Sequence, residues 1–181
     1  MTIRAALSTR TLLVCAAIGV ATGIVAGIAG AVTLGVLAVV PYLYGLVLGS
    51  HVLPGIIAQE VLRRPLVALI THLFAALVGM AFNPAWAMRF IGTALLFGAI
   101  QEGIAALTRY RAWGRWRFYV SAVIIGVIVA AVVGFVVDLG RFELWVQVSY
   151  LTVSVLGPVA WTAVGIAIGN ALRRAGITSK R

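Results

Sequence analysis

The sequence predicts an all-α membrane protein, a six-transmembrane-helix bundle with both its N-terminus and its C-terminus in the cytoplasm. The first observation is composition: 63% of the 181 residues are hydrophobic and 10% are charged, whereas soluble domains have roughly 45–50% apolar residues. The second is that several apolar runs reach the roughly 20 residues needed to cross a bilayer. The third is the placement of the basic residues. We therefore expect a single integral membrane domain over residues 1–181.

Charged and Pro/Gly-containing breaks between the apolar runs define the expected spans. These spans cover residues 11–30, 41–62, 66–82, 89–108, 119–137 and 145–172. Segment 31–40 is apolar but too short to cross a bilayer, so we expect a connection or a re-entrant piece packed against the bundle, where protein can shield its backbone. A count of seven spans is the alternative.

Basic residues fall on alternate connections, as they do in membrane proteins whose cytoplasmic loops are positively charged. Twelve of the fourteen lie on one side of the expected topology, whereas Arg89 and Arg141 lie on the other. This split predicts cytoplasmic termini, an even number of crossings and a multi-pass protein of the bacterial cytoplasmic (inner) membrane. The apolar run after Arg10 exceeds the roughly 7–15-residue core of a signal peptide, so we expect it to be retained as a span.

The net charge of +10 is therefore mainly a topology signal, and we expect no nucleic-acid partner. The Arg- and Trp-rich connection 109–118 suits anionic lipid headgroups. The sequence lacks a Walker phosphate loop, a His-Glu-x-x-His pair and a Gly-x-Ser-x-Gly elbow. With four acids and two histidines, we expect no metal site, no cofactor, no enzyme activity and no ATPase site of its own. Cys15 is expected to be a small buried side chain.

Ionisable side chains at membrane depth are costly, and they tend to face a cavity or a partner. Glu102 is the clearest case, because it lies about 9 Å from the expected cytoplasmic edge at Thr108–Arg109, at 1.5 Å rise per residue. We expect it to contact a ligand or a structural partner, with the Gln101 amide beside it. The alternative is a carboxylate that is protonated or reaches the membrane interface. His51 and His72, mid-depth in their spans, either offer an imidazole to a ligand or bridge helices.

Aromatic and amide side chains gather at the expected outer ends of the spans. They are Tyr42, Tyr44, Asn83, Trp86, Trp145, Gln147 and Tyr150. Such residues form the aromatic belt of membrane proteins, but three separate connections supply them, so they can also line a pocket for a flat heteroaromatic ligand. The candidate ligand-binding residues are Glu102, His72, Tyr42, Tyr44, Asn83, Trp86, Gln101, Trp145 and Tyr150.

The first span carries small residues at four-residue steps. Gly19, Gly23 and Gly27 form one row, and Ala17 and Ala21 belong to a parallel row. Small side chains let helix backbones approach closely. The stripe therefore predicts a docking face, either for another helix of the same bundle or for a separate subunit.

A six-helix bundle of this size, with a small-residue first helix and no energy domain, resembles the substrate-capture (S) component of an energy-coupling factor (ECF) vitamin transporter. More specifically, it is similar to the YkoE family of thiamine or hydroxymethylpyrimidine permease subunits. The matching stretch covers about one third of the chain. It runs from Tyr44-Gly45 through Arg63-Arg64-Pro65 and Asn83-Pro84 to Glu102, which precedes Thr108-Arg109-Tyr110 by six residues. Where that family is expected to carry an acid in the third span, this sequence has His72.

The resemblance implies a subunit that captures thiamine or hydroxymethylpyrimidine from outside. It also implies two kinds of partner, a transmembrane coupling subunit and two ATP-binding cassette (ABC) ATPases. The coupling subunit would contact the small residues of the first helix, Ala17 and Ala21 with the row Gly19, Gly23 and Gly27. Two alternatives remain open: an S component for a different vitamin, and a membrane assembly or scaffold protein that binds helices or lipid.

Overall fold

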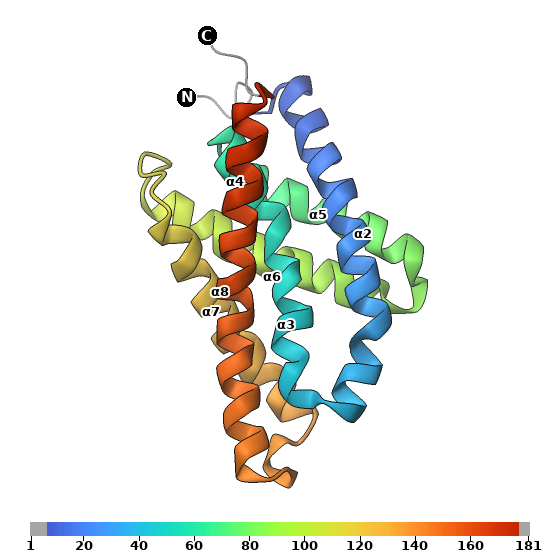
Figure 1. Cartoon of the computed structure of the whole chain (residues 1–181). Helices are drawn as coiled ribbons and strands as arrows, with labels where there is room; N and C mark the ends of the chain where they lie inside the picture. The colour runs from blue at the N-terminus through green and yellow to red at the C-terminus, as the bar shows by residue number, and fades with distance from the viewer. Residues whose placement is uncertain (1–6, 178–181) are drawn as a thin grey trace.

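The structure is a computed structural model that describes residues 7–177. These residues form α-helices and short 3-10 turns, without a β-strand in the part described. The α-helices are α2 (Thr9–Val39), α3 (Tyr44–Gly49), α4 (Leu53–Leu62), α5 (Val67–Phe82), α6 (Ala87–Leu107), α7 (Trp116–Val136) and α8 (Leu144–Arg174). The turns are η1 (Pro41–Leu43), η2 (Ser50–Val52), η3 (Pro84–Trp86) and η4 (Leu139–Arg141). The all-α prediction is confirmed (Figure 1).

Helix α2 corrects the prediction for segment 31–40. It is one continuous helix of 31 residues, so the segment extends the first span and is neither a separate connection nor a re-entrant piece. The segment contains no charge or proline that would end a helix, and the first proline comes at Pro41. Because the proline ring disfavours a helical conformation in the preceding residue, the helix ends at Val39 and the chain turns through η1.

Five helical segments of the described chain are long and apolar enough to cross a membrane. They are Thr9–Val39, Pro41–Leu62, Pro84–Leu107, Trp116–Val136 and Leu144–Arg174. The sixth, α5, has 16 residues, which corresponds to about 24 Å against a hydrocarbon core of about 30 Å. In Figure 1, α5 and α6 run across the direction of α2 and α8. The count of six crossings therefore stays a prediction.

The beginning of α2 and the end of α8 meet at one end of the bundle (Figure 1). The Arg10 guanidinium donates a hydrogen bond to the Ile177 carbonyl at 3.1 Å. Nearby, Arg173 forms an ion pair with the buried Glu60 carboxylate at 2.7 Å. Arg141, by contrast, lies in η4 between α7 and α8. The fold thus places both described ends of the chain together, as expected for an even number of crossings.

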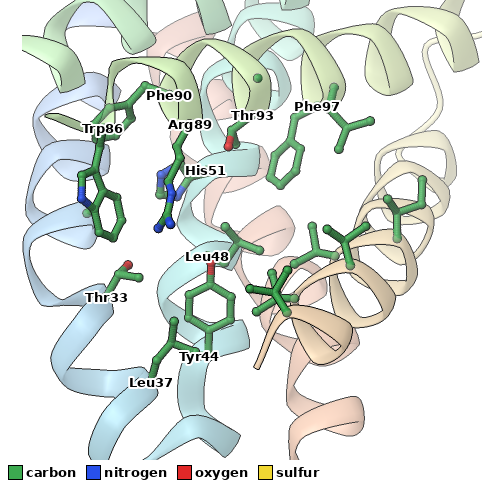
Figure 2. A pocket seen from close by; sticks show the side chains of 18 of the residues that line it. Thr33, Leu37, Tyr44, Leu48, His51, Trp86, Arg89, Phe90, Thr93 and Phe97 are labelled. Carbon is green, nitrogen blue, oxygen red and sulfur yellow. The ribbon is translucent and has the colours of Figure 1, made fainter. Parts of the chain in front are cut away.

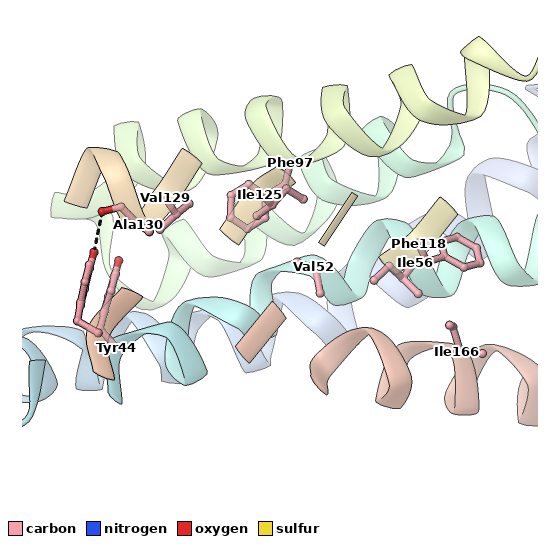
Figure 3. Packing of buried hydrophobic residues seen from close by; sticks show 10 residues of the cluster. Tyr44, Val52, Ile56, Phe97, Phe118, Ile125, Val129, Ala130 and Ile166 are labelled. Atoms are coloured by element: carbon pink, nitrogen blue, oxygen red, sulfur yellow. Dashed lines mark hydrogen bonds between the residues drawn. The ribbon is translucent and has the colours of Figure 1, made fainter. Parts of the chain in front are cut away.

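The largest hydrophobic cluster fills the space between the α3–α4 segment and helices α6, α7 and α8 (Figure 3). Its buried residues are Tyr44, Val52, Ile56, Phe97, Phe118, Ile125, Val129, Ala130, Tyr150 and Ile166. Helix α3 meets α8 backbone to backbone at Gly45 and Gly157, where a side chain on either residue would collide with the opposite main chain. Cys15 is fully buried in a second cluster, as predicted.

Candidate functional site: a cavity between α2, α3, α6 and α7

A cavity of about 530 Å³ lies where α6 and α7 separate, and α2 and α3 close its other sides (Figure 2). Its lining comes from the C-terminal parts of α2 and α7, the N-terminal part of α6, helix α3 and the turns η2 and η3. It therefore lies away from the end where α2 begins and α8 finishes. The volume is within the roughly 300–1,000 Å³ typical of small-molecule sites.

Most of the polar atoms that the cavity offers are hydrogen-bond donors. Figure 2 shows the Arg89 guanidinium extending from α6 into the space, opposite the Tyr44 hydroxyl, with Thr93 and His51 nearby. The guanidinium carbon of Arg89 lies 4.5 Å from the centre of the Trp86 ring, a cation–π contact. Among the described residues that line the cavity, none is an aspartate or a glutamate.

Aromatic and aliphatic side chains form the remaining walls. The His51 ring stacks on Phe90, with ring centres 6.5 Å apart and an angle of 17° between the planes. The rest of the described lining is Gly30, Thr33, Leu34, Leu37, Leu48, Gly92, Leu96, Phe97, Ile128, Val129, Val132, Val133, Val136 and Val137. The cavity is thus an apolar slot with one fixed positive charge, suited to a flat organic molecule that accepts hydrogen bonds.

His72 lies behind the main cavity. A space of about 20 Å³, enough for about one water molecule, separates His72 from His51 and shares Phe90 and Thr93 with the main cavity. The Nε2 atom of His72 is 3.0 Å from Oε1 of Gln101, whose amide nitrogen donates to the Val52 carbonyl at 3.1 Å. His72 and Gln101 therefore bridge helices, one of the two roles that the sequence left open for the histidine.

Glu102 lies in a structural network outside the cavity lining. Its carboxylate accepts hydrogen bonds from the backbone N–H groups of Leu66 at 2.5 Å and Ala68 at 3.1 Å, and from the Gln59 amide at 3.3 Å. Those N–H groups belong to the start of α5, where Leu66 has a left-handed backbone with φ of 66°. Glu102 thus caps α5, and a negative charge at a helix N-terminus is favourable.

Comparison with known proteins places the chain in a transport family. A family model described as an ABC-type cobalt transport system, permease component, matches residues 10–128, well over half of the chain. The chain belongs to this permease family. A crystal structure of an S-component of an ECF transporter has the same fold, with a TM-score of 0.81 and 17% identity over 94% of this chain and 87% of that chain. No curated protein in the comparison matches significantly.

The expected S-component fold is thereby confirmed for this permease component. The cavity, however, is lined by only some of the predicted ligand-binding residues. Of the nine candidate residues, Tyr44 and Trp86 line the cavity and the other seven lie outside its lining. Tyr42 packs against Trp145 with ring centres 5.5 Å apart, and the Tyr150 hydroxyl donates to the Ala130 carbonyl inside the core. Of the other four, Glu102, Gln101 and His72 belong to the hydrogen-bond networks described above. Asn83 directly precedes η3.

Arg89, Phe90, Thr93 and Phe97 line the cavity but were not among the predicted ligand-binding residues, and for His51 the sequence left open a ligand contact or a helix bridge. A helical signal was present, because residues 86, 89, 90, 93 and 97 recur at three- and four-residue steps and so share one face of a helix. Arg89 was counted only as a topology marker. Its spacing of three residues from Trp86 could have indicated a joint site.

The small-residue stripe of α2 divides into two faces in this permease component. Gly19, Gly23 and Gly27 pack against α5 within the same bundle; a side-chain carbon at Gly23 would come within 2.7 Å of the Ala75 carbonyl oxygen. Ala17 and Ala21 are exposed. The glycine row therefore holds the bundle together, and the alanine row is the face that a separate subunit can reach.

The Arg-rich connection between α6 and α7 is only partly exposed. Arg117 is 1% exposed, stacks on Trp113 at 4.1 Å and donates to the Gln59 side-chain oxygen at 3.3 Å. Burial and the nearby Glu102 carboxylate raise the pKa of Tyr110 to about 12. Residues of this connection thus lie beside the hydrogen-bond network of Glu102 and Gln59. Because Arg117 is buried, it is not positioned to contact lipid headgroups.

Proposed function

We propose that the protein is the substrate-capture (S) component of an ECF-type ABC importer of the bacterial cytoplasmic membrane. The observation that carries the proposal is the cavity of about 530 Å³, within a permease-family chain that has an S-component fold. In this proposal the Arg-rich end faces the cytoplasm, as the positive-inside rule requires. The cavity then lies toward the outer surface, where it can take up a solute.

The proposed ligands are those that the sequence resemblance implies, hydroxymethylpyrimidine or thiamine. A pyrimidine ring is flat and accepts hydrogen bonds, so it complements Trp86, Phe90 and the donors Tyr44 and Arg89. The fixed charge of Arg89 favours the uncharged pyrimidine over thiamine, whose thiazolium ring is cationic. The same charge opposes a bare cobalt cation, and the described residues contain no group of three or more His, Cys, Asp or Glu side chains suited to a metal ion.

The proposed partners are a transmembrane coupling subunit and two ABC ATPases. The exposed alanines of α2, Ala17 and Ala21, form the proposed contact with the coupling subunit, because small side chains allow close approach of a second helix. ATP hydrolysis would take place in the ATPases, and the S component would bind and release the solute.

Titration of the purified protein with hydroxymethylpyrimidine is expected to quench tryptophan fluorescence saturably, because Trp86 lines the cavity. Thiamine is expected to bind at least about tenfold more weakly, a difference of about 1.4 kcal/mol. Trp86→Phe should reduce the quenching amplitude, while calorimetry still detects binding. Trp116→Phe, a change at an exposed tryptophan outside the lining, is the matched control.

Two results would redirect the proposal. Saturable binding of another vitamin, with no response to either pyrimidine compound, would replace the ligand and keep the S-component role. Failure to bind any such solute, together with co-purification of an unrelated membrane complex, would favour the assembly-protein alternative.

A further inference from the structure

We propose that Arg89 makes the cavity selective for flat ring compounds that carry an anionic group, a carboxylate or a phosphate. This inference rests on the proposed function, since it assumes that the cavity is the solute site. It deepens that function by adding an anionic group to the flat ring compound, so that a ring with a carboxylate or phosphate binds more tightly than its uncharged counterpart. The ring would lie among the aromatic and valine walls, and the anionic group would meet the guanidinium.

The first support is the geometry of Arg89. Its guanidinium lies over the face of Trp86, 4.5 Å from the ring centre, and extends into the cavity in Figure 2. A cation–π contact uses none of the guanidinium N–H groups as hydrogen-bond donors to an oxygen, and a guanidinium can bind two oxygen atoms at once. Within the described residues, Arg89 makes no ion pair, in contrast to Arg63, Arg141 and Arg173.

The second support is the position of every acidic residue in the chain. Glu60 pairs with Arg173, Glu102 caps α5 and Asp138 pairs with Arg141, whereas Glu143 lies in the connection before α8. None of them lines the cavity. The Arg89 charge is therefore not neutralised by a carboxylate of the described cavity wall. An anionic ligand group would supply that neutralisation at the mouth of a cavity whose other walls are mainly apolar.

The third support is the set of neighbouring donors. The Tyr44 hydroxyl and Thr93 face the same space as Arg89 (Figure 2). The Thr33 hydroxyl, by contrast, already donates to the Ala29 carbonyl at 2.8 Å, so it does not compete for the ligand as a donor. A carboxylate or phosphate has several acceptor positions, which allows it to meet Arg89 and Tyr44 together.

The same anion chemistry is present in free solutes and in the headgroups of anionic lipids. Arg89 is exposed, and the cavity is bordered by exposed side chains such as Val132 and Val136. The apolar space between Phe90, Phe97 and the α7 valines suits a flat ring. This favours a free ring compound over a lipid headgroup as the ligand. The experiment separates the two sources by including a lipid arm.

The test uses matched ligand pairs that differ in one charge: hydroxymethylpyrimidine phosphate with hydroxymethylpyrimidine, and nicotinate with nicotinamide. Calorimetry on the purified full chain, in a neutral detergent without anionic lipid, measures both members of each pair. We expect the anionic member of at least one pair to bind about tenfold or more tightly than its uncharged partner. Arg89→Gln should reduce that ratio to less than about threefold, because it weakens binding of the anionic member more than binding of the uncharged member. Arg141→Gln, which removes an exposed arginine outside the cavity, should leave the ratio unaltered.

Three outcomes would overturn the inference: equal affinity within every pair, an equal loss for both members in Arg89→Gln, or no binding by any anionic member. The lipid arm uses native mass spectrometry after exposure to phosphatidylglycerol. Lipid retention that Arg89→Gln abolishes, without solute binding, would assign the charge to a headgroup and also overturn the inference. Co-purification with a coupling subunit tests the proposed function separately. Selective anion binding without that subunit would sustain the role of Arg89 and remove the S-component assignment.

Discussion

Replacement of Glu102 by alanine is expected to lower the melting temperature of the purified protein sharply, while ligand affinity at the cavity stays within about threefold of wild type. Glu102 is 6% exposed, and its carboxylate accepts from two backbone N–H groups at the start of α5, those of Leu66 and Ala68. Hydrogen bonds to charged groups contribute roughly 1.5–3 kcal/mol each. Their loss should therefore cost about 3 kcal/mol or more, and it would leave the buried Ala68 N–H and the part-buried Leu66 N–H without this acceptor.

Two variants make the Glu102 result specific. Glu102→Gln keeps one acceptor oxygen, so its melting temperature should fall between those of wild type and Glu102→Ala. Glu143→Ala removes an exposed acid and should melt within roughly 2 °C of wild type. Thermal unfolding followed by fluorescence, together with calorimetric binding, measures both quantities. An unchanged melting temperature with tenfold weaker binding would instead place Glu102 at the ligand.

Hydropathy was sufficient to predict the helical segments, because a bilayer imposes a minimum apolar length on each span. Hydropathy was insufficient to predict the structure of residues 31–40. The segment is too short to cross a bilayer by itself, which suggested a break, but it contains no charge or proline that would end a helix. Val39 ends α2 because Pro41 follows closely. The charge count also predicted that the chain ends share one side, and the Arg10 to Ile177 hydrogen bond brings them together.

The candidate site was harder to predict, because a polar residue in an apolar helix can either contact a ligand or form a hydrogen bond to another helix. Glu102 meets Leu66 and Ala68, which are 36 and 34 residues away in sequence, and no local pattern reveals such a contact. Tyr44 and Trp86 lie at span ends on the side with few charges, and both line the cavity. Their contact with a ligand stays a prediction. Arg89 was missed because its charge had already been explained by topology.

Helix α2 provides the second prediction with a large expected effect, because two neighbouring positions test its two faces. Gly23→Leu is expected to destabilise the protein strongly, since the new side chain would meet the Ala75 backbone, which cannot move aside alone. Overpacking of this kind costs roughly 1–3 kcal/mol or more. Leucine is a better helix former than glycine, so a loss of stability would report the α2–α5 contact and not a weaker helix.

Ala21→Leu is the matched variant on the exposed face of the same helix. It should melt within roughly 2 °C of wild type, because an exposed leucine is compatible with lipid, and it should bind solute normally. Co-purification with the coupling subunit should nevertheless be lost, since the added bulk separates two helices that would otherwise touch. Normal recovery of the complex by Ala21→Leu would contradict the proposed docking face. A Gly23→Leu protein with wild-type stability that fails to assemble would return the docking role to the glycine row.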